Sequence, residues 1–297
     1  MQPTDVQFRG EDGVTVRGRL YLPDCQYPCP AISMAHGFAA TIDHGLAQFA
    51  RVFTNGGFAV LMHDHRGFGN SEGEPRADID PWRQIADWRH AVSFLETHPA
   101  VDRTRIGLWG TSFAGGHVLV LGATDPRIKA VVSQVPTISG FEQSQRRVPP
   151  DHVAQHDQRF VTDDRRHQAG HPPATQLVVH TDDSRTAVYG SREARDFYLQ
   201  VLPEATAWEN TVTLRSTRAA SMYEPGQWAS RVSPTPLLMV VALEDAVTLT
   251  DTALRAYEQA LQPKALVTYP GGHFGAYAEH FDIASSAALN WFTTHLT

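Results

Sequence analysis

Ser112 constrains the fold of this chain more than any other residue because of the sequence on either side of it. Residues 106–109 are typical of a short apolar strand, and an apolar helix is expected over 112–123. Gly110 allows a tight corner between the two, and Ala114 stands where the G-x-S-x-G pattern has its last glycine. This is the layout of a nucleophile elbow, a strained strand-to-helix corner that raises the hydroxyl to the top of an α/β sheet. A serine that only caps the helix is the alternative interpretation.

A serine hydroxyl is a weak nucleophile unless a base and an orienting acid stand beside it. Residues 236–242 form a continuous apolar run, which is typical of a buried parallel strand, and Asp245 follows its end. A second short strand over 265–269 leads through two glycines to His273. Both side chains therefore lie on loops that follow strands, where an acid and a base are needed.

The order serine, acid, histidine along the chain is the order that accompanies a nucleophile elbow. We therefore predict that Ser112, Asp245 and His273 form a catalytic triad. Glu244 is the alternative acid, and a loop histidine without a catalytic role is the alternative interpretation of His273.

An oxyanion hole requires two backbone amides, one from the residue after the nucleophile and one from a loop after an early strand. Phe113 supplies the first amide. Residues 31–36 are typical of a buried strand, and the loop that follows places Phe38 as the second donor, with Gly37 giving the backbone freedom to aim it. His36 is expected to hold this loop through its ring.

Strands and helices alternate along most of the remaining chain. We expect a hairpin over 4–22, strands over 31–36, 58–64 and 128–135, and helices over 43–55, 81–97 and 250–261. This alternation implies βαβ units and a mainly parallel sheet flanked by helices. Residues 138–233 break the rhythm, because they are rich in Pro, Arg, Asp, Gln and His and their helical signal, at 191–201, is short. We therefore predict an α/β core of residues 1–137 and 234–297 with an inserted cap of residues 138–233.

The expected cap holds the candidates for substrate contacts. Four of its apolar residues would line an acyl pocket, or would pack a small core of the cap itself: Trp208, Met222, Tyr223 and Trp228. Three charged residues could contact a polar substrate group, although solvated surface charge is the favoured interpretation of each, and they are Asp151, Arg159 and Arg215. His152 and His156 have the spacing of a metal-binding pair, but the glutamate of H-E-x-x-H is missing. We therefore predict no metal and no cofactor.

Four segments resemble the α/β-hydrolase superfamily, and they are Met34–Phe38, His63–Ser71, Leu108–Leu119 and Tyr269–Phe274. The last two, with residues 132–140, more narrowly resemble the polyketide transferase-type serine hydrolases. The resemblance covers about residues 5–140 and 232–297. It implies the α/β-hydrolase fold, a triad formed by Ser112, Asp245 and His273, and no cofactor. It also implies action on esters or thioesters, with acyl transfer to alcohols as a further activity of such proteins.

Composition restricts the remaining function classes. The 297 residues carry a net charge of −7, so no basic face indicates nucleic acid or an anionic membrane as a partner. The N-terminal residues have no basic and then apolar stretch, and no run approaches about 18 apolar residues, so we expect neither a secretory signal nor a membrane span. Two cysteines, Cys25 and Cys29, fit free thiols in a reducing compartment. We therefore expect a cytoplasmic enzyme with a small-molecule acyl substrate, and the sequence leaves a homo-oligomer open.

The predicted function is a serine hydrolase that cleaves an ester or thioester through an acyl-enzyme, which water or an alcohol then resolves. An amidase or peptidase would use the same triad, and so would a C–C bond hydrolase. A non-catalytic binding protein that kept the fold is the alternative from another class, although a binder needs no ordered Ser, Asp and His.

Overall fold

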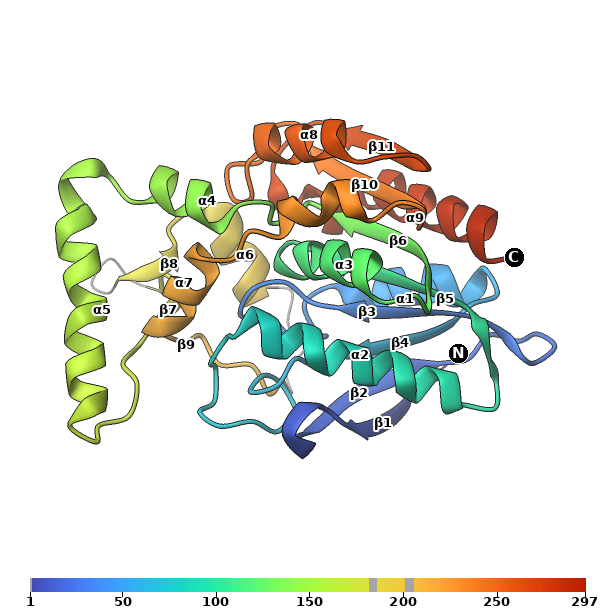
Figure 1. Ribbon diagram of the computed structural model, residues 1–297, viewed down its shortest axis with the longest axis horizontal. Helices are drawn as coiled ribbons and strands as arrows, with labels where there is room; N and C mark the ends of the chain where they lie inside the picture. Colours follow the sequence, from blue (N-terminus) through green and yellow to red (C-terminus); the bar gives the residue numbers. More distant parts are fainter. Residues whose placement is uncertain (1, 182–185, 201–205) are drawn as a thin grey trace.

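One eight-stranded sheet forms the centre of the computed structural model, which describes residues 2–181, 186–200 and 206–297 (Figure 1). In their order across the sheet the strands are β1 (Thr4–Arg9), β2 (Thr15–Tyr21), β4 (Ala59–His63), β3 (Cys29–Ala35), β5 (Val101–Thr111), β6 (Ile128–Gln134), β10 (Leu237–Ala242) and β11 (Lys264–Tyr269). β2 pairs antiparallel with β1 and β4, and every other neighbouring pair is parallel. The predicted N-terminal hairpin and mainly parallel sheet are therefore present.

Helices cover both faces of this sheet. One face packs against α2 (Pro81–Thr97), α3 (Phe113–Thr124) and α8 (Thr250–Gln259), and the other against α1 (Leu46–Asn55) and α9 (Phe281–Leu296). Successive side chains of a strand point to opposite faces, so Leu108 and Trp109 of β5 lie in two different hydrophobic clusters. The strands buried on both faces explain the continuous apolar runs in the sequence.

The ends of the core helices follow local signals. Asp80 caps α2, because its carboxylate accepts hydrogen bonds from the amides of Trp82 and Arg83, and Pro81 occupies the first turn. The helix expected over 43–55 begins only at Leu46, since Gly45 adopts a left-handed φ of 76° at the N-cap.

The segment between β6 and β10 carries its own elements. They are α4 (Gly140–Arg147), α5 (Val153–Gln168), β7 (Thr175–Val179), β8 (Ala187–Tyr189), α6 (Arg192–Gln200), β9 (Val212–Thr213), α7 (Leu214–Ser221) and a 3₁₀ helix over Pro225–Arg231. The three strands form a separate small sheet in the order β8-β7-β9. Figure 1 shows most of this segment at one end of the molecule, with α5 farthest from the large sheet, while the 3₁₀ helix packs against α3 and α8.

Sequence patterns missed most of this segment. α6 lies within the predicted helix 191–201, whose last residue is outside the described residues. α5 was not predicted, and the reason is that Asp163 is its one buried residue, so no apolar period marks the helix.

Three expectations concern membranes, metals and thiols. Within the described ranges, no helix is both long and apolar enough to cross a bilayer. The same residues contain no group of three His, Cys, Asp or Glu side chains placed to hold a metal ion. Cys25 is exposed, Cys29 is buried, and both are free thiols.

Candidate active site

Ser112 occupies the strained corner between β5 and α3. Its φ of 56° and ψ of −116° lie outside the regions that L-residues favour, a strain that typically costs about 1–3 kcal/mol. The corner is held by two backbone hydrogen bonds, from the Ser112 amide to the Gln134 carbonyl (2.8 Å) and from the Thr137 amide to the Ser112 carbonyl (2.9 Å). A Cβ at Gly110 would lie 2.2 Å from the Ala114 carbonyl oxygen, so this position requires glycine.

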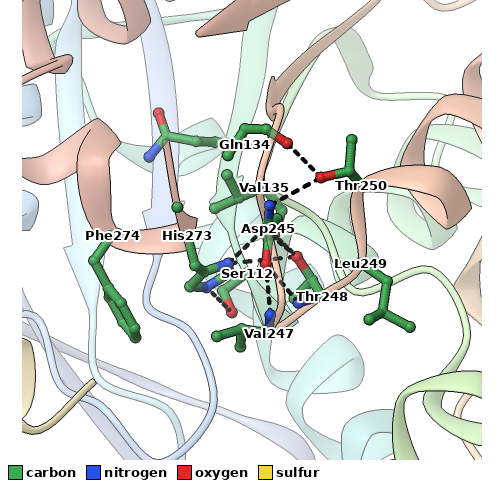
Figure 2. Close-up of polar contacts among 12 residues, drawn as sticks. Ser112, Gln134, Val135, Asp245, Val247, Thr248, Leu249, Thr250, His273 and Phe274 are labelled. Atoms are coloured by element: carbon green, nitrogen blue, oxygen red, sulfur yellow. Dashed lines mark hydrogen bonds and ion pairs between the residues drawn. The ribbon is translucent and has the colours of Figure 1, made fainter. Parts of the chain in front are cut away.

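The structure brings the three predicted triad residues together (Figure 2). Ser112 Oγ lies 3.0 Å from His273 Nε2, and His273 Nδ1 lies 2.7 Å from Asp245 Oδ2. All three side chains are buried, with 8%, 2% and 6% of Ser112, His273 and Asp245 exposed. The alternative acid, Glu244, is exposed to solvent. This arrangement allows the imidazole to accept the serine proton while the carboxylate holds Nδ1–H.

Asp245 lies in a cradle of donors that the sequence analysis did not identify. Its Oδ1 accepts hydrogen bonds from the amides of Val247 and Thr248, both at 2.8 Å, and its Oδ2 accepts one from Thr248 Oγ1 at 2.7 Å (Figure 2). Burial alone would raise the pKa of this carboxyl, but the charge and hydrogen bond of His273, together with the Thr248 donors, lower it below its ordinary value. The carboxylate is therefore ionised, as an orienting acid must be.

Two backbone amides next to Ser112 are available for an oxyanion. Phe113 begins α3, so its amide has no partner within the helix, and Phe38 follows β3 on the neighbouring loop. Among the residues that the structure describes, neither amide donates a hydrogen bond. The two loops approach closely, because a Cβ on Gly37 would lie 2.9 Å from Ser112 Cβ. This close approach explains why glycine precedes Phe38.

Residues from the segment between β6 and β10 hold the Phe38 loop in place. The hydroxyl of Tyr198, on α6, donates to the Phe38 carbonyl oxygen at 2.6 Å, and Trp208 Nε1 donates to the Ala39 carbonyl oxygen at 2.7 Å. Ala39 itself adopts a positive φ of 52°. Sequence reasoning missed Tyr198, since the two partners are 160 positions apart and no local pattern connects them.

The His36 ring lies beneath the same loop. Its Nε2 accepts a hydrogen bond from the His65 amide at 3.1 Å, so its Nδ1 carries the proton and donates to the Gly37 carbonyl oxygen at 3.0 Å. Burial lowers the pKa of His36 to about 4. The ring is therefore neutral near pH 7 and holds the loop in the way the sequence led us to expect.

A cavity of about 360 Å³ opens beside Ser112. Its lining includes Phe38 and Phe113 and extends over α4, α5, β7, β8 and α7. This volume falls within the range of about 300–1,000 Å³ that is typical of small-molecule sites. Both His152, which is exposed, and His156, which is half-buried, line it.

The four aromatic and methionine residues predicted to line this cavity do not line it, and that expectation is corrected. Trp208 instead binds the Ala39 carbonyl. Tyr223 is buried with its hydroxyl 2.9 Å from His117 Nδ1, while Met222 is 70% exposed. The Trp228 ring packs under the Arg231 guanidinium. These side chains therefore pack against other parts of the protein or, for Met222, lie at the surface.

Of the three charged candidates for substrate contact, only Arg159 lines the cavity. Arg215 forms an ion pair with Asp78, with 2.7 Å between Nη2 and Oδ2, and does not line the cavity. Asp151 is exposed and also lies outside the lining, whereas Arg159 of α5 is part of it.

Comparisons with known proteins agree with this architecture. The family model for X-Pro dipeptidyl-peptidases (S15 family) matches residues 12–275. The quorum-quenching protein AidA of Acinetobacter baumannii is 33% identical over 275 residues, which cover 93% of this chain and 89% of AidA. The thiohydrolase aneE of Aspergillus aculeatus is 30% identical over 277 residues, covering 90% of this chain and 84% of aneE.

A solved structure extends the similarity to the whole fold. The crystal structure of the α/β hydrolase GrgF from Penicillium sp. sh18 is 26% identical and aligns with a TM-score of 0.85, over 100% of this chain and 99% of GrgF. The expected fold class and the resemblance to polyketide transferase-type hydrolases are thereby confirmed. The chain belongs to the X-Pro dipeptidyl-peptidase (S15) family, has the α/β-hydrolase fold and is an enzyme of the serine hydrolase class.

Proposed function

We propose that this enzyme is an esterase or thioesterase that forms an acyl-enzyme on Ser112. The observation that carries the proposal is the continuous hydrogen-bonded series from Ser112 Oγ to His273 (3.0 Å) and from His273 to Asp245 (2.7 Å), with Ser112 in the lining of a cavity. The thiohydrolases and polyketide transferases among the relatives support an ester or thioester carbonyl as the reacting group.

The geometry supports a two-step reaction. His273 takes the proton of Ser112 as the oxygen attacks the carbonyl, and Asp245 stabilises the imidazolium that forms. The amides of Phe38 and Phe113 donate to the oxyanion, after which the intermediate collapses and releases an alcohol or a thiol. A water molecule, or an alcohol acceptor, then attacks the acyl-enzyme with His273 as the base.

The cavity lining favours an acyl substrate over a peptide. A dipeptidyl-peptidase has to bind the free ammonium group of its substrate, for which a carboxylate is the natural partner. Among the described residues that line the cavity, none is Asp or Glu. We also propose that residues 138–233 act as the cap that shapes this cavity, over a catalytic core of residues 1–137 and 234–297.

The test is a fluorophosphonate probe read by intact mass, with wild type and Ser112→Ala compared. One adduct per chain is expected on the wild type and none on the variant, because the probe reacts with an activated serine. Turnover of esters and acyl thioesters should fall at least about 10⁴-fold in Ser112→Ala.

Two controls complete this experiment. Circular dichroism and a thermal melt establish that Ser112→Ala is folded, and product analysis with added alcohol distinguishes hydrolysis from acyl transfer. Substantial turnover by a folded Ser112→Ala variant would contradict the mechanism. A wild type that takes up no probe would also contradict it.

A further inference from the structure

Among the described residues, the lining of the cavity at Ser112 carries positive charge and no carboxylate. Its described lining residues include two arginines, Arg147 and Arg159, and no Asp or Glu. Most of the other groups beyond the triad are neutral and polar, among them Gln143, Gln155 and Gln176. A cavity meant only for a hydrocarbon chain would be lined by apolar side chains, so this lining indicates a substrate with polar and negative groups.

Arg159 carries the stronger part of this argument. It lies on α5 and is half-buried, and its Nη2 donates to Gln176 Oε1 at 2.9 Å. Burial lowers the pKa of its guanidinium, and no carboxylate of the described residues offsets that effect. A desolvated cation without a counter-ion is unfavourable, and a bound anion would relieve that cost.

Two arginines near the cavity but outside its lining are paired with carboxylates. Arg218 on α7 binds Asp164 with 2.6 Å between Nη1 and Oδ2, and Arg146 binds Asp251 at 2.8 Å. Arg147, the neighbour of Arg146, instead lies over the Tyr189 ring, 5.1 Å from its centroid, and donates to the Val247 carbonyl oxygen at 3.4 Å. Arg165 of α5 is exposed and also has no ion pair among the described residues, so the feature particular to Arg159 is its half-buried position in the cavity lining.

We propose that the substrate carries an anionic oxygen group, a carboxylate or a phosphate, that Arg159 binds while Arg147 adds to the positive potential of the cavity. The planar guanidinium presents two parallel N–H donors that match either group. The inference rests on the proposed function, because the cavity is the one in which Ser112 is placed to act. The anion belongs either to the far end of the acyl chain or to the leaving thiol.

Two pairs of substrates distinguish these sources. In the first, N-acetylcysteamine thioesters carry an acyl chain that ends in a carboxylate or in its methyl ester. In the second, one neutral acyl chain is attached to phosphopantetheine or to pantetheine. Within one pair, we expect kcat/KM to be about tenfold or more higher for the anionic member, as befits a charge-assisted hydrogen bond.

Arg159→Gln should abolish this preference by lowering kcat/KM of the anionic member to about that of its neutral partner measured with the same variant. The matched control is Arg165→Gln, which removes the same charge from an exposed position of the same helix. Added salt should reduce the preference of the wild type, a readout that needs no variant. If Arg159→Gln fails to fold, Arg147→Gln takes its place and should reduce the preference.

Equal kcat/KM for the charged and neutral members of both pairs, with Ser112-dependent turnover intact, would overturn the inference and leave the proposed function standing. Absence of Ser112-dependent turnover on every member would instead contradict the proposed function. Calorimetric binding of the dicarboxylic product and its monomethyl ester to the wild type then decides the inference separately. The inference would be overturned if the dicarboxylic product bound no more tightly than its monomethyl ester and phosphopantetheine bound no more tightly than pantetheine.

Discussion

The Tyr198 hydroxyl donates a hydrogen bond of 2.6 Å to the carbonyl oxygen of Phe38, a residue that lines the cavity at Ser112. The Phe38 carbonyl shares a peptide plane with the Ala39 amide, so this hydrogen bond restrains the Phe38 amide through the backbone dihedral angles of Phe38. The adjacent carbonyl, that of Ala39, accepts from Trp208 Nε1 at 2.7 Å. The segment between β6 and β10 therefore holds the Phe38 loop as well as lining the cavity.

Replacing Tyr198 by Phe removes that hydrogen bond and leaves the ring. We expect kcat to fall about tenfold with little change in KM, which is less than the roughly 10²–10³-fold loss that follows removal of an oxyanion donor. Affinity for a boronate transition-state analogue should fall in parallel. Tyr257→Phe, at a half-buried tyrosine of α8, is the control. An unchanged kcat in folded Tyr198→Phe would show that the hydroxyl does not position the loop.

Asp245 and Glu244 provide a matched test of the orienting acid. We expect Asp245→Asn to lower kcat by about 10⁴-fold, because a neutral amide stabilises neither the required tautomer nor the imidazolium. Glu244→Gln should leave kcat unchanged, since Glu244 is exposed while Asp245 lies 2.7 Å from His273. Steady-state kinetics on one ester substrate measures both. A large loss of kcat in Glu244→Gln would contradict the assignment of the orienting acid to Asp245.

Buried histidines predict that the protein loses stability in mild acid. Burial lowers the pKa of His36 from 6.5 to about 4. It lowers the pKa of three further histidines to about 3, and these are His44, His63 and His117. Below about pH 6.5 the unfolded chain binds protons that the folded protein does not, so the free energy of unfolding falls as the pH falls.

One buried carboxyl opposes this trend. Burial raises the pKa of Asp64 from 3.8 to about 6, so between these values the folded protein binds a proton that the unfolded chain does not. Each group changes the free energy of unfolding by about 1.4 kcal/mol per pH unit at most, and the four histidines outweigh the single aspartate.

Urea unfolding between about pH 8 and pH 5 measures the balance. The free energy of unfolding should be constant above pH 7 as far as these groups determine it, and should decline below about pH 6.5. His152→Gln, at an exposed histidine, should have the same decline. A free energy of unfolding that stays constant to about pH 5 would contradict the prediction.

The sequence by itself determined the core and the placing of the three triad candidates. The elbow at Ser112 is a local pattern of strand, glycine and helix, and Asp245 and His273 each follow a strand of the same parallel sheet. Because the carboxyl ends of parallel strands meet at one edge, residues far apart in the chain could be predicted to lie together there. The bounds of α2 were predicted to the residue for the same local reason, a cap and an apolar period.

Only the tertiary structure decided the cavity and its supports. The α5 helix has no apolar period, because only one of its residues is buried. No sequence pattern therefore placed Arg159 in the cavity lining. Trp208 was expected to line the pocket or to pack a core of the cap, yet its indole binds a carbonyl 169 positions away. Periodicity reports which face of an element is buried, whereas hydrogen bonds between distant segments depend on how those segments pack, and local sequence carries no record of that packing.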